Sequence, residues 1–223
     1  MVKASHGSNA GKQWSWTYDQ RGRMVTATDP ETGTTTTTYD HQDRPLTTTN
    51  ARGVTLWNGY DQLSRPTQQR LGDANGTLLA SYTYDTAARG IGLPASVTRY
   101  TDGLPYTQAI GGFTTDYQPT STTLTLPESI ANEWGLKPTY TYSYDYTDTG
   151  LPETMQMPAV GGFPAEKLLV RYTKDGLPLT VSGQDWYGSE TAYSPYGRCS
   201  ARRWARIRTG SGRSRPTTRQ AAR

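Results

Sequence analysis

Cysteine, histidine and large aliphatic residues are scarce in this chain of 223 residues. Cys199 is the only cysteine, which excludes an intramolecular disulfide framework and a metal site built on paired cysteines. The two histidines, His6 and His41, leave little material for a Ser-His-Asp triad or a histidine-rich metal site. No run of 18 apolar residues exists that would span a membrane. We therefore expect no catalytic residues, no cofactor and no bound metal.

Tyrosine, tryptophan and threonine replace the missing aliphatic side chains. Leu, Ile, Val and Phe together provide only 29 residues, whereas the chain has 16 Tyr and 6 Trp and is rich in Thr. A low aliphatic content combined with a high net charge indicates disorder, but the formal net charge here is only +4. Tyr, Trp and Thr favour the pleated, half-buried surface of a sheet. The composition therefore predicts an all-β protein held together by aromatic side chains.

Positive charge is concentrated at the C-terminal end. Residues 198–223 contain nine of the 23 basic residues and no acidic residue, so the first 197 residues carry 14 basic and 19 acidic side chains. Residues 1–13 lack the apolar stretch of a secretory signal peptide, so export would depend on a larger parent protein or on another route. We predict a disordered N-terminus at 1–13, a β-sheet domain at 14–197 and a disordered Arg-rich tail at 198–223.

Tyrosine followed by aspartate recurs at nearly constant spacing. The pairs begin at Tyr18, Tyr39, Tyr60 and Tyr84, with spacings of 21, 21 and 24 residues, which is typical of a repeat architecture. The first three copies read Tyr-Asp-Gln-Arg-Gly-Arg, Tyr-Asp-His-Gln-Asp-Arg and Tyr-Asp-Gln-Leu-Ser-Arg. The aspartate predicts an Asx-type turn in each copy.

The fourth residue after the tyrosine is Gly22, Asp43 or Ser64. Glycine and aspartate tolerate positive φ at such a position, whereas serine does so poorly. We therefore expect the third copy to form a different turn. Past residue 85 the repeat is looser, and the sequence Gly-Leu-Pro recurs at residues 92–94, 103–105, 150–152 and 176–178.

A second type of turn lies between the tyrosine turns. Residues 29–33, 50–53 and 73–76 each begin with Asp or Asn and end with Gly, which is a reverse-turn signal. Turns about every 10 residues leave strands of roughly 5 to 8 residues, a normal strand length. The pattern predicts an up-and-down ribbon of antiparallel hairpins, with residues 126–134 as the one stretch expected to form a short helix.

Aromatic residues alternate with polar ones along the clearest predicted strands. Tyr140 and Tyr142 belong to a run of four tyrosines at period 2 in residues 139–146, and Trp14 and Trp16 repeat this pattern. These rings either pack hairpin against hairpin or form a platform that stacks against sugars. The structural interpretation is favoured because the stripe recurs in every clear repeat. Asp145 and Asp148 are candidates for an acid/base pair, but their neighbours mark them as turn residues, and we interpret them as such.

The Tyr-Asp-x-x-Gly-Arg segments, with Thr-Asp-Pro-x-x-Gly and Thr-rich strands between them, resemble the YD repeat of bacterial Rhs proteins, toxin-complex shell components and teneurins. The match covers residues 14–85 well and residues 86–197 more loosely. The resemblance implies a β-ribbon that, in complete members, spirals into a hollow, non-catalytic shell around a C-terminal toxin or effector. Complete members are much longer than this chain. We therefore expect a truncated fragment that forms a curved open sheet, a partial β-shell.

The Arg-rich tail has three interpretations. Its arginines and Trp204 would suit phosphate backbones, or the tail is simply an exposed charged end. The third interpretation is a shifted reading frame, because the composition changes abruptly after Gly197. We favour the third and expect no nucleic-acid partner.

The sequence thus predicts a non-catalytic structural segment of an Rhs-type shell that encloses or delivers a C-terminal toxin. Its expected partners are the rest of the shell and the toxin, and its expected location is outside the cell or at the cell surface as part of a larger parent. The alternative is a carbohydrate-binding module for cell-surface glycans. In that case Trp14, Trp16, Tyr140 and Tyr142 would face solvent, whereas packed rings favour the structural role.

Overall fold

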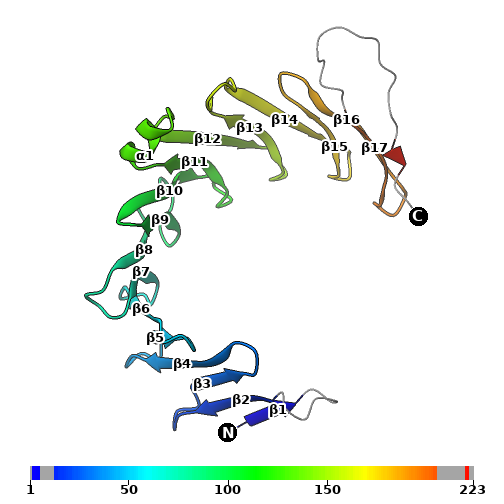
Figure 1. Ribbon diagram of the computed structural model, residues 1–223. Helices are drawn as coiled ribbons and strands as arrows, with labels where there is room; N and C mark the ends of the chain where they lie inside the picture. The colour runs from blue at the N-terminus through cyan, green and yellow to red at the C-terminus, as the bar shows by residue number, and fades with distance from the viewer. Residues whose placement is uncertain (1, 6–12, 205–218, 221–223) are drawn as a thin grey trace. The chain divides into compact units, whose positions relative to one another are not determined.

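The computed structural model describes residues 2–5, 13–204 and 219–220, which form β-strands and one short helix (Figure 1). The chain divides into two compact units, of which unit 1 comprises Met1–Tyr84 and Ser96–Tyr106 and unit 2 comprises Asp85–Ala95 and Thr107–Arg223. The strands of the first half are β1 (Val2–Ser5), β2 (Gln13–Tyr18), β3 (Met24–Asp29), β4 (Gly33–Tyr39), β5 (Pro45–Thr49), β6 (Thr55–Tyr60), β7 (Pro66–Leu71), β8 (Leu78–Tyr84) and β9 (Pro94–Thr101). They are followed by β10 (Leu104–Phe113), β11 (Pro119–Thr125), α1 (Glu128–Glu133), β12 (Thr139–Tyr146), β13 (Pro152–Met157), β14 (Glu166–Tyr172), β15 (Pro178–Ser182), β16 (Trp186–Tyr193), β17 (Cys199–Trp204) and β18 (Arg219–Gln220).

Unit 1 is an antiparallel sheet in which each strand from β1 to β8 pairs with the next one along the chain. Because side chains alternate between faces, the register places a row of threonines on one face across β2 to β6. The row consists of Thr17, Thr26, Thr36, Thr49 and Thr55. Neighbouring hydroxyls hydrogen bond across the strands, at 2.5 Å for Thr17 and Thr26 and 2.8 Å for Thr49 and Thr55. Threonine thus serves as a cross-strand pair former.

The first type of turn is the same in all three regular copies. Gly22, Asp43 and Ser64 have φ values of 79°, 63° and 65°, and each donates its N–H to the main-chain oxygen three residues earlier. The expectation of a different turn at Ser64 is therefore wrong. The carboxylate of Asp61 accepts the N–H groups of Leu63 and Arg65, both at 2.9 Å, and these bonds hold the left-handed backbone that serine alone disfavours.

The second type of turn joins the strands of unit 1 at the ends away from the tyrosine turns, as the sequence predicts. In residues 50–53 the Asn50 side-chain oxygen accepts the N–H groups of Arg52 and Val54 at 3.0 and 3.1 Å. In residues 29–33 the Asp29 carboxylate accepts the N–H of Glu31 at 2.7 Å. Both are Asx-type closures, in which a side chain takes the place of a main-chain acceptor.

Unit 2 repeats the hairpin pattern, with each strand from β10 to β18 pairing with the next. The predicted short helix at 126–134 is confirmed as α1, with Pro127 at its N-cap. The pairing extends outside the predicted range of 14–197, because β1 pairs with β2 and β17 pairs with β16. β17 begins at Cys199, directly after the turn that starts at Ser194.

Burial is shallow, as expected for a single layer of strands. Among the described residues the buried apolar side chains are Ala95, Phe113, Ala131 and Tyr140, all in unit 2. Most other strand residues are half-buried. The all-β prediction of antiparallel hairpins in an open sheet is confirmed, and cohesion must come from contacts between neighbouring hairpins.

Candidate functional site

Six of the tyrosines that begin a turn join their hairpin to the preceding one. The hydroxyl of each donates a hydrogen bond to a main-chain oxygen just after the previous turn. The contacts, three in each unit, are Tyr39 to Met24 (2.7 Å), Tyr60 to Pro45 (2.8 Å), Tyr84 to Pro66 (2.9 Å), Tyr146 to Pro119 (2.8 Å), Tyr172 to Pro152 (2.5 Å) and Tyr193 to Pro178 (2.6 Å). We call these six contacts the tyrosine ladder.

A one-residue shift in strand register accompanies the tyrosine ladder. The pairing slips at Tyr39, where Thr38 pairs with Thr47 but Tyr39 pairs with Pro45. The same slip occurs at Tyr18, Tyr60, Tyr146, Tyr172 and Tyr193. A bulge of this kind redirects the backbone locally.

In unit 1 a carboxylate closes each tyrosine turn. One oxygen of Asp40 accepts the N–H groups of Gln42 and Arg44 at 2.9 and 3.0 Å, and the other accepts Nε of Arg44 at 2.6 Å. Asp19 and Asp61 make the same contacts with Arg23 and Arg65. The carboxylate therefore fixes both the turn and the arginine that follows it.

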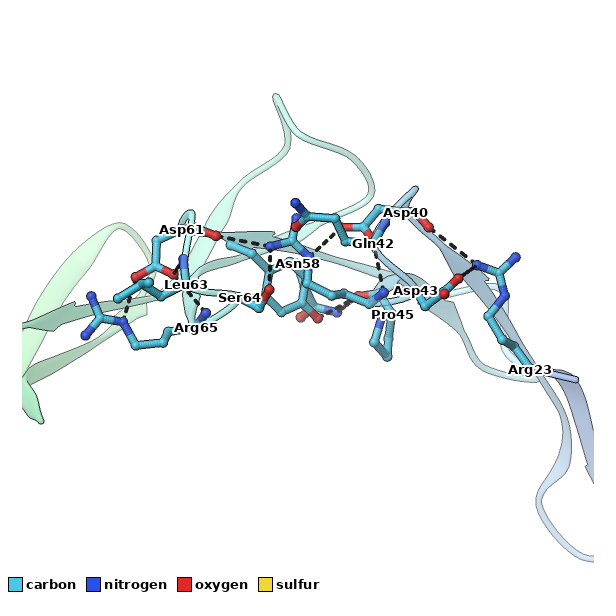
Figure 2. A network of polar contacts seen from close by, with 12 residues as sticks. Arg23, Asp40, Gln42, Asp43, Pro45, Asn58, Asp61, Leu63, Ser64 and Arg65 are labelled. Atoms are coloured by element: carbon cyan, nitrogen blue, oxygen red, sulfur yellow. Dashed lines mark hydrogen bonds and ion pairs between the residues drawn. The ribbon is translucent and has the colours of Figure 1, made fainter. Parts of the chain in front are cut away.

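The same arginine reaches forward to the next hairpin. The guanidinium of Arg44 lies 4.5 Å from the ring centre of Tyr60 and donates to the main-chain oxygen of Asp61 at 3.1 Å. Arg23 makes the equivalent contacts with Tyr39 and Asp40, and the Arg65 guanidinium lies 4.3 Å from the ring centre of Tyr84. Figure 2 shows this network running from Arg23 at Asp40 and Asp43 towards Asp61 and Arg65. Each arginine thus bridges two consecutive repeats.

The ionisation equilibria of the network reflect these contacts. The N–H of Arg65 and then its guanidinium lower the pKa of Asp61, although partial burial opposes the shift. At Asp40 burial acts to raise the pKa, but the hydrogen bonds from Arg44 and Gln42 outweigh it and the net shift is downward. Burial raises the pKa of Tyr60 and of Tyr146, so these two hydroxyls stay protonated and able to donate.

In unit 2 the same turn is closed without charge. The hydroxyl of Thr147 accepts the N–H of Leu151 at 3.0 Å, and that of Thr173 accepts the N–H of Leu177 at 3.1 Å. Leu151 and Leu177 take the position of the bridging arginine, whereas the turn after Tyr193 has Arg198 there and is closed by the hydroxyl of Ser194. A Cβ built on Gly176 would lie 3.5 Å from Cδ1 of Leu151, which shows that Leu151 packs on the next turn. The turns after Tyr146 and Tyr172 therefore replace the bridging cation with an apolar side chain.

The four residues predicted to bind glycans lie in two different units. Trp14 and Trp16 are half-buried on β2 in unit 1, and Nε1 of Trp14 donates to Asp29 at 3.1 Å. Tyr140 and Tyr142 lie on β12 in unit 2, where Tyr140 is only 5% exposed and its hydroxyl accepts the N–H of Lys137 at 3.0 Å. Trp14 and Tyr140 have internal polar partners, which favours packing. Glycan binding at these residues stays a prediction.

The bridging role of the tyrosine hydroxyl was missed by the sequence reasoning. The available signal was proline, which follows six residues after Tyr39, Tyr60, Tyr146 and Tyr172. Proline has no N–H to pair in the sheet, and its carbonyl is the group that the next tyrosine reaches. In the Gly-Leu-Pro segments at residues 150–152 and 176–178, leucine stands where the earlier repeats have the bridging arginine. The sequence showed this exchange, but it did not show that the position contacts the next repeat.

Within the described ranges, no group of three or more His, Cys, Asp or Glu side chains is placed to hold a metal ion. No helix in the same ranges has the length and apolar character needed to cross a membrane.

Comparisons with known proteins place this geometry in a wider context. Residues 4–34 match the family model of the RHS Repeat. No curated protein sequence matches the chain. The chain resembles the crystal structure of TcdB2-TccC3 without its hypervariable C-terminal region, with a TM-score of 0.69 and 14% sequence identity. The match covers 86% of this chain and 10% of that one. The chain also resembles the Tc holotoxin pore of Photorhabdus luminescens carrying a mutation in TccC3, with a TM-score of 0.66, 16% identity and the same coverages.

These likenesses concern the fold, and this chain spans about a tenth of the length of those toxin-complex chains. The RHS repeat at residues 4–34 lies in unit 1, where the Tyr-Asp-Arg turns are regular. In unit 2 the tyrosine hydroxyls join successive hairpins by the same hydrogen bond. Residues 4–34 are thus similar to the RHS Repeat, and the fold of the chain is similar to that of the toxin-complex structures.

Proposed function

We propose that this chain is a non-catalytic structural segment of an Rhs/YD-repeat shell that encloses or delivers a C-terminal toxin. The tyrosine ladder is the observation that carries the proposal. It joins a hairpin to the one before it in both units. The chain is therefore a repeat array in which each hairpin contacts its neighbours, and such an array can be lengthened by further repeats.

The engagement of the polar residues supports a structural role. In unit 1 the aspartates and arginines of the turns bind each other and the neighbouring turn, and the tyrosine hydroxyls bind main-chain oxygens. A catalytic carboxylate or tyrosine needs freedom to face a substrate. These groups instead have their hydrogen-bonding capacity directed within the sheet.

The partners follow from the size of the similar structures. The chain corresponds to about a tenth of the toxin-complex chains that share its fold, so the proposed partners are further shell repeats and the enclosed toxin. The proposed location is that of the larger parent, either secreted or at the cell surface.

Cross-linking in the producing cells, followed by mass spectrometry, tests this proposal. We expect the chain in an assembly larger than 24.6 kDa, with cross-links from its hairpins to other YD-repeat polypeptide. Recovery as an isolated chain with no such cross-links would contradict the shell role. Hydrolase or nuclease activity that co-purifies with the pure protein and is lost on substitution of a described residue would contradict the non-catalytic part.

A further inference from the structure

Two asparagines of unit 1 are followed by glycine, and the structure holds the two pairs differently. Asn58 and Gly59 lie inside β6 and pair with residues of β7. Asn75 and Gly76 lie in the connection between β7 and β8. Asparagine before glycine is a reactive pair, because glycine has no side chain to keep its main-chain nitrogen away from the asparagine amide. One intrinsic reactivity is therefore present in two different surroundings.

The side chain of Asn58 is fixed by its neighbours. Its Nδ2 donates to the main-chain oxygen of Pro45 at 3.3 Å, and its Oδ1 accepts Nε2 of Gln69, also at 3.3 Å. Gly59 is buried, and a Cβ built on it would lie 2.8 Å from Cη2 of Trp57. A reaction between the Gly59 nitrogen and the Asn58 amide would require these bonds to break and the strand to leave the sheet.

Asn75 lies in an exposed turn, and its side chain is not fixed. Within the part of the chain that the structure describes, no hydrogen bond holds its side-chain amide. The main-chain N–H of Asn75 donates to the Asp73 carboxylate at 2.7 Å, and the N–H of Gly76 donates to the main-chain oxygen of Asp73 at 3.0 Å. Only opening of the turn is needed to free the Gly76 nitrogen, and exposed turns open at a far lower free energy than paired strands.

We propose that Asn75 is a site of spontaneous deamidation in the folded chain, whereas Asn58 is protected. The main-chain nitrogen of Gly76 loses its proton and attacks Cγ of Asn75, which forms a new C–N bond. The bond from Cγ to Nδ2 breaks, and Nδ2 takes up a proton and leaves as ammonia. Water then opens the cyclic imide. Cleavage at Cγ gives aspartate, and cleavage at the main-chain carbon gives isoaspartate, in which the main chain runs through Cγ.

The turn requires the glycine that makes Asn75 reactive. A Cβ built on Gly76 would overlap the main-chain oxygen of Leu71, so no other residue fits there without movement of the backbone. The oxygen of Gly76 also accepts Nη1 of Arg70 at 2.9 Å. Isoaspartate lengthens the main chain by one atom just before Gly76. It should therefore displace the glycine and loosen the end of the hairpin of β7 and β8. The reaction needs only water, so it is independent of any shell.

Peptide mapping by mass spectrometry tests the proposal on the full, folded chain after incubation in mildly alkaline buffer. Trypsin places the two asparagines in separate peptides, residues 53–70 and 71–89, because Arg65 precedes a proline and resists cleavage. Replacement of the amide NH2 by OH raises the peptide mass. We expect Asn75 to react more than about tenfold faster than Asn58, because the turn opens more readily than the paired strand.

Denatured protein provides the matched control. In urea the two pairs lose their different surroundings, so their rates should agree within a few-fold. The variant Asn75→Gln should show no reaction at position 75, because its longer side chain closes a larger ring, and should leave the rate at Asn58 unchanged. Circular dichroism of the variant verifies that the sheet is retained.

Three outcomes would overturn the proposal. In the folded chain, equal rates at Asn75 and Asn58 would show that the surroundings do not select the site. An Asn75 that reacts in urea but stays intact in the folded chain would show that the bond from Gly76 to Asp73 protects it. Formation of aspartate without isoaspartate would exclude the cyclic imide, which opens at either carbonyl. Hydrogen exchange of aged and fresh protein tests the consequence for the turn, and we expect faster exchange at residues 71–78 after ageing.

Discussion

In unit 1 an aspartate and an arginine close the turn after each regular tyrosine, whereas after Tyr146 and Tyr172 in unit 2 a threonine and a leucine hold the same positions. The backbone is unchanged by this exchange, since Ser64 and Gly176 both have positive φ and donate to the oxygen three residues earlier. The tyrosine hydroxyl also makes the same bond in both units. The comparison shows that the tyrosine and the left-handed turn residue define the repeat, and that the charge on the turn can vary.

The two chemistries differ in what they respond to. Aspartate and arginine form charge-assisted bonds, which are shorter and stronger than neutral ones but weaken with salt and with protonation of the carboxylate. Exposed ion pairs add little net stability. The hydroxyl and leucine contacts of unit 2 are independent of pH and salt. The shared tyrosine should therefore dominate stability in both units, and the turn chemistry should tune it.

Removal of a ladder tyrosine should have the largest effect and should be alike in the two units. Tyr60→Ala and Tyr146→Ala each lose a half-buried ring and a hydrogen bond, so we expect each to lower the free energy of unfolding by about 2 kcal/mol. Urea denaturation followed by circular dichroism measures this. The control is Tyr117→Ala, which removes a 69% exposed ring and should change stability by less than about 0.5 kcal/mol. A large loss in one unit only would refute the shared role of the tyrosine.

The repeat was visible in the sequence because its markers are local. Tyrosine followed by aspartate and a turn residue specifies a bend within seven residues, so the hairpins and the all-β class follow without knowledge of packing. The bond from Tyr60 to Pro45 is not local, since its partners are 15 residues apart and meet only after the strands pair. The same limit explains why Trp14 looked available for a ligand, although Asp29 accepts its indole N–H.

The turn at Ser64 failed as a prediction for a different reason. Residue preferences treat serine alone, but the turn is held by the Asp61 carboxylate and by the strands on both sides. The exposed rings of Trp134, Phe163 and Trp186 in unit 2 are scattered in sequence, so no local motif marks them.

The cost of the left-handed turn residue can be measured by exchange between units. A non-glycine residue at positive φ costs roughly 1–2 kcal/mol relative to glycine. Ser64→Gly should therefore stabilise the protein by about 1 kcal/mol, and Gly176→Ser should destabilise it by about 1 kcal/mol. Thermal unfolding of the two variants checks both signs. Destabilisation by Ser64→Gly would mean that the hydroxyl contact with Arg44, at 3.4 Å, outweighs the backbone strain.

Loss of the tyrosine hydroxyl alone should have a smaller effect. Tyr60→Phe and Tyr172→Phe keep the ring and remove the donor, so we expect a loss of about 1 kcal/mol for each. In unit 1 the variant also keeps the contact with the Arg44 guanidinium. A double variant of Tyr60→Ala with Arg44→Leu, measured with both single variants, gives the coupling between ring and cation. No coupling would show that the guanidinium only positions the turn.

Acid should weaken the turns of unit 1 but not those of unit 2, whereas alkali should affect both units alike. Asp19, Asp40 and Asp61 have lowered pKa values in the folded chain, so their contribution is present above the unfolded value near 3.8 and is lost as pH falls through the folded value. Thr147 and Thr173 do not titrate there. Tyr60 in unit 1 and Tyr146 in unit 2 have raised pKa values, so their contribution is lost only as pH rises through the folded value, above 10.

Hydrogen exchange with mass spectrometry resolves this difference by peptide. Between pH 5 and pH 3, protection corrected for intrinsic rates should fall at residues 40–46 and 61–67 while that at residues 147–153 and 173–179 changes little. Asp61→Thr, which copies the unit 2 residue, should abolish the fall at its own turn and leave its neighbour sensitive. If both units lose protection together, the sheet opens as one cooperative body and the carboxylates act on the whole array. If neither does, the exposed ion pairs contribute too little to detect, and the difference between the units is one of sequence without consequence for stability.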